Sequence, residues 1–229
     1  MPRRAAPEPG EALLVLAHLD VPSPRLDGLR ATFAPREEQR FRAFATEALR
    51  SRWGTARGAL REVLGAALGC APREVAFRYG AHGKPQLAGS SLRFNISHSG
   101  ALALIAVAHV EVGVDVELPR ARRTDAIARR FYARGEIERL FAIEDAAARA
   151  DAFFRLWTCK EAFLKATGEG LSRSTRSYEI SADASRVLWA TGISDAAQRY
   201  TVHPLEIGDP YRAALVAEGA VSLRRYRWA

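Results

Sequence analysis

The apolar positions along this chain follow two periods, one typical of helices and one typical of strands. Residues 35–68 carry apolar side chains at helical spacing, although interspersed glycines allow two helices in place of one. Further helical patterns cover residues 124–131 and 144–167. Short apolar runs predict strands at residues 11–19, 75–79, 92–96, 101–108, 112–117, 177–180, 186–191, 200–203, 211–217 and 221–227. Residues 21–24 and 80–89 are predicted loops.

Each half of the chain therefore places helices before or between strands, which predicts an α+β protein. The length of 229 residues and the hydrophobic content of 48% suit one large or two small domains with a sizeable core. The apolar run at residues 12–19 is too short to span a bilayer and lacks a small-residue cleavage site. We interpret it as a first buried strand and expect a cytoplasmic protein with no membrane association.

The chain is basic, with 34 Lys and Arg against 26 Asp and Glu and a net charge of +8. This charge indicates either a solvated Arg-rich surface or an anionic partner such as a nucleic acid, a coenzyme or an acidic carrier protein. No strand interleaves aromatic and basic residues, which argues against nucleic acid. Cys70 and Cys159 form no CxxC pair, so we expect two free thiols and interpret Cys159 as a packing residue.

Acidic residues suggest a metal site. Asp115 and Glu117 lie two apart on a predicted strand, so both face the same side. Taken alone, the pair is better explained as an exposed strand edge. Glu161 lies mid-helix among apolar residues, with Lys160 and Lys165 nearby, and such buried charges need partners. Two arrangements would provide these partners. One is an internal Lys–Glu pair, and the other is a metal site in which Glu161 joins Asp115 and Glu117 as oxygen ligands, which Mg²⁺ prefers.

Several basic and small polar residues are candidates for phosphate binding. Ser97 and His98 end a strand before the small Ser99-Gly100 turn, which leaves room for a ligand, although a His at a strand end is often structural. Lys84 lies on the Gly-rich loop and is either solvated or a ligand contact. The first helical region carries several Arg residues, whose planar guanidinium groups suit phosphate, and Arg61 among them is expected to be solvated.

Three segments carry a family resemblance through their order and spacing: Asn-Ile-Ser-His-Ser at 95–99, Gly-Val-Asp-Val-Glu at 113–117 and Trp-Thr-Cys-Lys-Glu-Ala-Phe-Leu-Lys at 157–165. Between Pro35 and Ser172 the chain resembles the 4′-phosphopantetheinyl transferases, in particular their larger single-chain class, which serves biosynthetic synthases. The resemblance implies a monomer of two similar α+β lobes in a pseudo-twofold arrangement, with the active site between them. Residues 1–111 would form the lobe with the coenzyme A nucleotide contacts, and residues 112–229 the lobe with the metal site and catalytic helix.

The resemblance also implies an activity and roles for residues. The enzyme would move phosphopantetheine from coenzyme A to a serine of an apo acyl or peptidyl carrier protein and release adenosine 3′,5′-bisphosphate. The metal ligands for Mg²⁺ would be Asp115, Glu117 and Glu161, and the catalytic groups Glu161 and Lys165. The coenzyme A contacts would be Arg40, Arg52, Lys84, Ser97, His98 and Lys160, with a structural role for Lys160 as the alternative. Glu37 stands where some members have Lys. A Mg²⁺-dependent nucleotide hydrolase is the rival interpretation.

Overall fold

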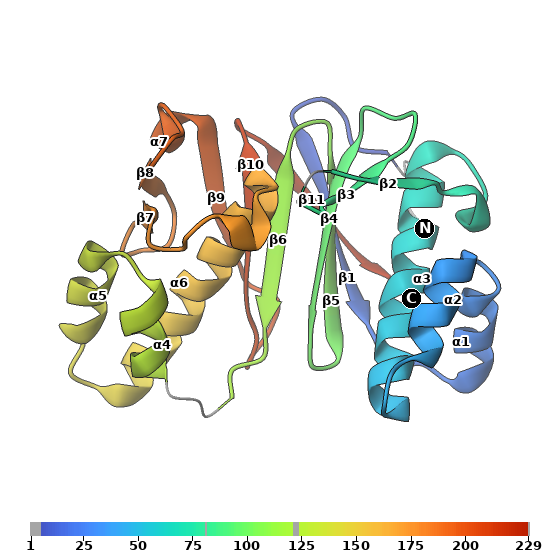
Figure 1. Cartoon of the computed structure of the whole chain (residues 1–229), viewed down its shortest axis with the longest axis horizontal. Coiled ribbons are helices and arrows are strands. Elements are labelled where there is room, and N and C mark those ends of the chain that lie inside the picture. Colours follow the sequence, from blue (N-terminus) through green and yellow to red (C-terminus); the bar gives the residue numbers. More distant parts are fainter. Residues whose placement is uncertain (1–5, 81, 121–123, 229) are drawn as a thin grey trace.

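Two β-sheets pack against each other at the centre of the protein, and helices cover their outer faces (Figure 1). The structure is a computed structural model that describes residues 6–80, 82–120 and 124–228. The first sheet contains, in order, β11 (Ser222–Trp228), β1 (Glu11–His18), β5 (Leu102–Ala108) and β4 (Arg93–Ser99). The second contains β6 (Val112–Glu117), β10 (Arg212–Glu218) and β9 (Tyr200–Leu205). Neighbouring strands are antiparallel except β1 and β11, which pair in parallel.

Two groups of helices flank these sheets (Figure 1). The first group is α1 (Ser23–Arg30), α2 (Pro35–Arg42) and α3 (Glu47–Leu68), and the second is α4 (Thr124–Phe131), α5 (Arg134–Phe141) and α6 (Ala146–Thr167). Two small sheets pair β2 (Phe77–Tyr79) with β3 (Pro85–Leu87), and β7 (Tyr178–Ile180) with β8 (Val187–Ala190). The remaining helical turns are α7 (Ala196–Arg199) and two 3₁₀ segments, Pro72–Glu74 and Gly170–Ser172.

Strand alternation explains this layering. In β5, Ile105 and Val107 join the core beneath α3, whereas Leu104 and Ala106 join the core between the two sheets. All seven residues of β5 are buried, because successive side chains of a strand point to opposite faces and both faces are covered here. Strand β10 of the second sheet repeats the pattern. Its Ala214 and Val216 pack in the core beneath α6, whereas Ala213 and Leu215 pack in the core between the two sheets.

The observed elements confirm the predicted α+β class, a mixed protein with several sheets. The division at residue 111 and the pseudo-twofold arrangement of two lobes stay predictions. Strand β6 and helix α4 have the predicted bounds, and the predicted helical region 35–68 is two helices, α2 and α3. Two loop predictions were wrong in part, since α1 begins at Ser23, with Pro24 in its first turn, and β3 lies within the glycine-rich loop.

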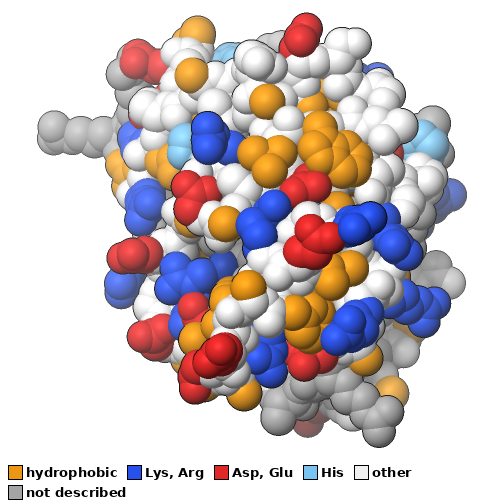
Figure 2. Space-filling view, turned by 90° about the vertical axis from the view of Figure 1, so that its left-hand side faces the viewer, with side chains coloured by type: hydrophobic (Ala, Val, Ile, Leu, Met, Phe, Trp, Pro, Cys, Tyr) orange, Lys and Arg blue, Asp and Glu red, His pale blue; other side chains and the backbone are white. Residues whose placement is uncertain are grey.

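The surface of the second half mixes charges of both signs. Figure 2 shows Lys and Arg side chains interspersed with Asp and Glu over the face at the left of Figure 1. Many are arranged as ion pairs, such as Arg134 with Glu138 and Arg139 with Glu179. In the described part of the chain, no helix has the length and apolarity that crossing a bilayer requires.

Candidate active site

The site lies where β6 meets α6. Val112, Val114 and Val116 point into the core between the sheets, so the intervening residues of β6 face α6. Gly113 lets the helix lie directly against the strand, because a Cβ atom there would lie only 2.0 Å from the carbonyl oxygen of Ala162. Asp115 and Glu117 therefore share one face of β6, as the sequence predicted, and α6 packs against this face.

Asp115 has one satisfied and one unsatisfied oxygen. Its side chain is buried, and Oδ1 accepts hydrogen bonds from Ser97 Oγ at 2.7 Å and Lys165 Nζ at 2.6 Å. Oδ2 is also buried and has no hydrogen-bond partner. A buried, unsatisfied carboxylate oxygen is costly, so a ligand that supplies positive charge would stabilise this arrangement.

Glu161 feels the charge of both strand carboxylates. Its pKa is raised above the usual value first by burial and then by the negative charge of Asp115, with a smaller contribution from Glu117. The charge of Lys165 offsets part of this effect. We call Asp115, Glu117 and Glu161 the carboxylate cluster. Its members repel one another electrostatically, which is the condition that a bound cation relieves.

A metal ion fits the chemistry of the carboxylate cluster. Carboxylate oxygens are the ligands of Mg²⁺, and both the unsatisfied Oδ2 of Asp115 and the raised pKa of Glu161 are features that a cation would correct. Among the described residues, no three His, Cys, Asp or Glu side chains are already arranged at the spacing of a metal site.

Small polar residues of β4 join the two sheets beside this cluster. Asn95 Oδ1 accepts from the backbone N–H of Val114 at 3.0 Å, and Ser99 Oγ donates to Glu117 at 3.2 Å. Ser97 lies between them and donates to Asp115. Because Asn95, Ser97 and Ser99 alternate along the strand, all three side chains face β6. The predicted phosphate contact Ser97 thus lies against the carboxylate cluster, between Asp115 and Lys165.

A cavity of about 420 Å³ lies between α2, α3 and the loop before β3. We call it the α2–α3 cavity, and its lining residues are Arg36, Glu37, Arg40, Trp53, Ala56, Arg57, Leu60, Tyr79, Gly83, Pro85, Ile96 and His98. Arg40 and His98 were predicted from the sequence, and the structure brings them into one cavity. The pKa of His98 is lowered first by burial and then by the positive charges of Lys165 and Arg40, so its ring is neutral near pH 7.

The sequence prediction missed part of this cavity. Arg36 and Tyr79 line it, and the side chain of Tyr79 is prominently exposed. Arg36 lies four residues before Arg40 on α2, and side chains at this spacing share a helix face. That spacing was the available signal. For Tyr79 the sequence offered none, because its exposure depends on how the β2–β3 hairpin packs.

The other predicted contacts have partners within the protein. Arg52 forms an ion pair with Asp20 at 2.7 Å and does not line the α2–α3 cavity. Lys160 is 1% exposed and donates to both oxygens of Glu136, at 2.9 and 2.7 Å. Lys84 donates to Glu111 at 2.7 Å. The structure therefore brings Lys165 and Ser97 to the carboxylate cluster and Arg40 and His98 to the cavity, but it leaves Arg52 and Lys160 apart from both. Lys84 lies between them and lines a smaller cavity together with Lys165.

Arg61 on α3 and Cys159 on α6 are both buried. The solvated position expected for Arg61 was wrong, because Arg61 is 2% exposed and donates to Glu37 at 2.7 Å. Glu37 in turn caps the start of α2 through the backbone N–H of Ala34. Cys159 packs in the core as interpreted, and burial raises the pKa of its thiol to about 12, which leaves it unreactive.

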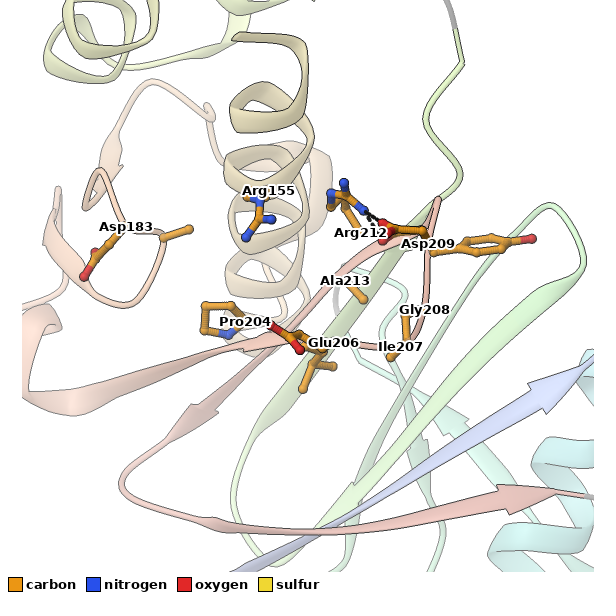
Figure 3. A pocket seen from close by; sticks show the side chains of 12 residues that line it. Arg155, Asp183, Pro204, Glu206, Ile207, Gly208, Asp209, Arg212 and Ala213 are labelled. Atoms are coloured by element: carbon orange, nitrogen blue, oxygen red, sulfur yellow. Dashed lines mark hydrogen bonds and ion pairs between the residues drawn. The ribbon is translucent and has the colours of Figure 1, made fainter. Parts of the chain in front are cut away.

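A separate cavity of about 360 Å³ lies at the other end of α6, beside Arg212 (Figure 3). Its charged side chains are largely engaged with one another. Arg212 pairs with Asp151 and Asp209, Arg155 pairs with Asp151, and Asp183 accepts from neighbouring serines. None of the sequence-predicted site residues lines this cavity.

Comparison with known proteins agrees with this geometry. Residues 111–216, which include the carboxylate cluster, match the model of the 4′-phosphopantetheinyl transferase superfamily. The chain is 42% identical over 161 residues to the 4′-phosphopantetheinyl transferase HetI of Nostoc sp. strain PCC 7120, and the match covers 68% of each protein. It is 39% identical over 108 residues to psf-1 of Bacillus pumilus and 33% identical over 108 residues to Sfp of Bacillus subtilis strain 168. These two matches cover about half of each chain, 46% and 45% for psf-1 and 47% and 47% for Sfp. Together the geometry and these matches show that this chain belongs to the 4′-phosphopantetheinyl transferase family.

Proposed function

We propose that this enzyme transfers the phosphopantetheine group of coenzyme A to a serine hydroxyl of an apo acyl or peptidyl carrier protein. One observation carries the proposal. The family's carboxylates and lysine, Asp115, Glu117, Glu161 and Lys165, converge between β6 and α6. Lys165 also lines a small cavity together with Gly83 and Pro85, which border the basic α2–α3 cavity. A site for phosphate chemistry and a site for an anionic nucleotide are therefore adjacent.

The carboxylate cluster would hold Mg²⁺ through Asp115, Glu117 and Glu161. When bound, this ion supplies positive charge that offsets the charge of the pyrophosphate oxygens. Lys165 adds a second positive charge beside Asp115. Ser97 keeps Oδ1 of Asp115 oriented toward Lys165, which leaves Oδ2 directed elsewhere.

The transfer needs a base for the serine proton. The serine oxygen forms a bond to the phosphorus that carries the pantetheine, and the bond from that phosphorus to the nucleotide oxygen breaks. Adenosine 3′,5′-bisphosphate leaves with the electron pair. Glu161 is our candidate for proton acceptor, because it is a carboxylate at the site where the serine hydroxyl would meet the pyrophosphate.

The α2–α3 cavity would hold the nucleotide. Arg36, Arg40 and Arg57 line it, and guanidinium groups bind phosphate through two parallel hydrogen bonds. His98 is neutral near pH 7 and gains charge as a phosphate approaches. The exposed ring of Tyr79 offers a face on which the adenine can stack.

Three further predicted contacts stay proposals. Arg52 can exchange Asp20 for a 3′-phosphate at small cost, because Asp20 is 61% exposed and surface ion pairs contribute little stability. Ser97 would contact phosphate only by sharing its hydroxyl with Asp115. Lys160 would have to leave a fully buried partner, Glu136, so its structural alternative has the stronger support.

Mass spectrometry of apo carrier proteins tests the proposal. The purified enzyme is incubated with coenzyme A, Mg²⁺ and a panel of apo acyl and peptidyl carriers. We expect one phosphopantetheine on the carrier serine, no modification of a serine-to-alanine carrier, and loss of activity in EDTA. Cleavage of coenzyme A without a carrier would indicate a hydrolase instead. A panel that stays unmodified throughout would contradict the proposal.

A further inference from the structure

Lys84 connects three parts of the fold. It lies on the loop before β3, and its ammonium donates to Glu111 Oε2 at 2.7 Å, to the carbonyl of Val112 at 3.2 Å and to the carbonyl of Ala166 at 3.1 Å. Its side chain is only 10% exposed. All three donors of the ammonium are therefore used inside the protein.

Two of these bonds join the elements that carry the carboxylate cluster. Val112 is the first residue of β6, and Ala166 belongs to the last turn of α6. The last carbonyls of a helix lack partners within the helix, and a cation near the C-terminus also interacts favourably with the helix dipole. Lys84 thus holds the C-terminal turn of α6 against the start of β6.

Glu111 extends this connection to the first sheet. Its Oε1 pairs with Arg93 Nε on β4 at 2.8 Å, while its Oε2 accepts from Lys84. The same loop also borders the α2–α3 cavity through Gly83 and Pro85. These two residues and Lys84 itself line a second, smaller cavity of about 210 Å³ together with Lys165 and Gly168. The wall of the nucleotide site and the end of the catalytic helix are therefore joined through one side chain.

We infer that Lys84 is a positioning residue that clamps the nucleotide-side loop to α6 and β6, and so fixes Glu161 and Lys165 relative to Asp115. This inference rests on the proposed function for its catalytic consequence, though not for the clamp itself. A direct phosphate contact by Lys84 would break up to three hydrogen bonds and leave the carbonyls of Val112 and Ala166 without this donor, which is costly when the groups are buried.

The variant Lys84→Met tests the clamp, because methionine keeps most of the apolar stem and removes all three donors. Its matched control is Arg93→Met, which removes the other cation on Glu111 but does not reach α6. Hydrogen exchange of the backbone amides at residues 164–170 is measured without substrate or metal. We expect faster exchange in Lys84→Met and no change at these amides in Arg93→Met.

Kinetics and binding complete the test. We expect kcat of Lys84→Met to fall about tenfold or more, the scale seen when an outer residue that orients ligands is lost. The Kd of coenzyme A in EDTA, measured by calorimetry, should stay within about threefold, because a positioning residue makes no contact with the nucleotide. A much weaker Kd with unchanged exchange at residues 164–170 would overturn the clamp and make Lys84 a nucleotide ligand.

A second variant keeps the inference testable if Lys84→Met does not fold. Glu111→Gln retains the shape and an acceptor but loses the charge that holds Lys84, so faster exchange at residues 164–170 is expected again, to a smaller extent. Unchanged exchange in a folded Glu111→Gln protein would contradict the clamp. Because exchange is read without a carrier, an inactive wild-type enzyme would contradict only the proposed function.

Discussion

Helices α3 and α6 are built alike but used differently. Each has 22 residues, begins with a side-chain cap and ends at a glycine in the left-handed conformation. Each also buries a cation that pairs with a glutamate 24 residues earlier, Arg61 with Glu37 and Lys160 with Glu136. Both glutamates cap the start of the preceding helix, through Ala34 and Ala133. This repetition supports the prediction of two similar lobes.

The two helices differ at the residue that directly follows the buried cation. On α3 it is Glu62, which accepts from Arg25 at 2.9 and 2.8 Å and from Trp228 Nε1 at 2.9 Å. On α6 it is Glu161, whose pKa is raised by burial and then by the negative charge of Asp115, with Lys165 opposing and Glu117 adding to the effect. One glutamate is neutralised and stabilises the fold, whereas the other keeps like charges nearby. The comparison places the candidate site where a shared helical framework leaves a carboxylate without full neutralisation.

Replacing these two glutamates should give the largest contrast. We expect Glu161→Gln to lower kcat/KM about 10³-fold, the scale of losing one preorganised electrostatic group, with the fold retained. The folded-state pKa of Glu161 is raised above 4.5, so ionisation destabilises the fold increasingly as pH rises from 4.5 through that raised value. In EDTA, Glu161→Gln should therefore melt at a higher temperature than the wild type above pH 4.5, and the difference should disappear below it.

Glu62→Gln is the matched control on α3. It should keep its activity but lose about 1.5–3 kcal/mol of unfolding free energy, because hydrogen bonds to a charged group are weakened. Addition of Mg²⁺ should raise the melting temperature of the wild type and of Glu62→Gln, and not of Glu161→Gln. A Glu161→Gln enzyme with wild-type turnover would remove this residue from the mechanism.

The buried cations provide the next contrast. Lys160→Met leaves the fully buried Glu136 without its cation, so we expect a loss of about 3–5 kcal/mol in urea unfolding. Arg61→Met should cost less, since Arg57 also pairs with Glu37 and remains. The double variant Lys160→Met with Glu136→Gln should recover part of the loss. If Arg61→Met proved the more damaging change, the two pairs would not be equivalent parts of a shared framework.

Two glycines test how closely each helix is packed. Gly113→Ala places Cβ 2.0 Å from the carbonyl oxygen of Ala162, and we expect a loss of about 1–3 kcal/mol as α6 moves outward. On the α3 side, Gly58→Ala places Cβ 2.5 Å from Leu29 Cβ and should cost a similar amount. Only Gly113→Ala moves the carboxylate cluster, so it alone should lower kcat. Equal kcat in the two folded variants would show that the close packing of α6 against β6 does not determine the geometry of the carboxylate cluster.

The helix caps should give the smallest effects. Thr46 accepts from the backbone N–H of Leu49, and Asp145 accepts from that of Ala148. Thr46→Ala and Asp145→Ala should each cost about 1 kcal/mol of unfolding free energy, with no change in kcat, because neither cap lies near the cluster. Denaturant unfolding of both variants checks this. A loss of activity in Asp145→Ala alone would mean that the start of α6 is coupled to the site.

The local pattern determined the elements on which the site rests. Alternation along residues 112–117 predicted that Asp115 and Glu117 share a face, and the structure shows this. The apolar surroundings of Glu161 predicted a buried helix position, and the structure places Glu161 half-buried. Helix α5 escaped prediction because its N-cap is Ala133, which gives no capping signal of its own. Only the hydrogen bond that the backbone N–H of Ala133 donates to Glu136 caps this helix. Most helices and strands could thus be predicted from local sequence, because hydrophobic periodicity and helix capping depend on neighbouring residues.

Partners were decided only by the tertiary structure. The family resemblance placed Lys165 and Asp115 in one site, but local spacing does not indicate that they form an ion pair across 50 residues. Nothing in the sequence indicates that Lys84 reaches Ala166, 82 residues away. A charged side chain finds the partner that packing brings within reach, and the unfavourable cost of leaving it buried alone enforces the pairing. The sequence therefore determined which faces carry charge, and the packing of β6, α6 and the loop before β3 determined which charges meet.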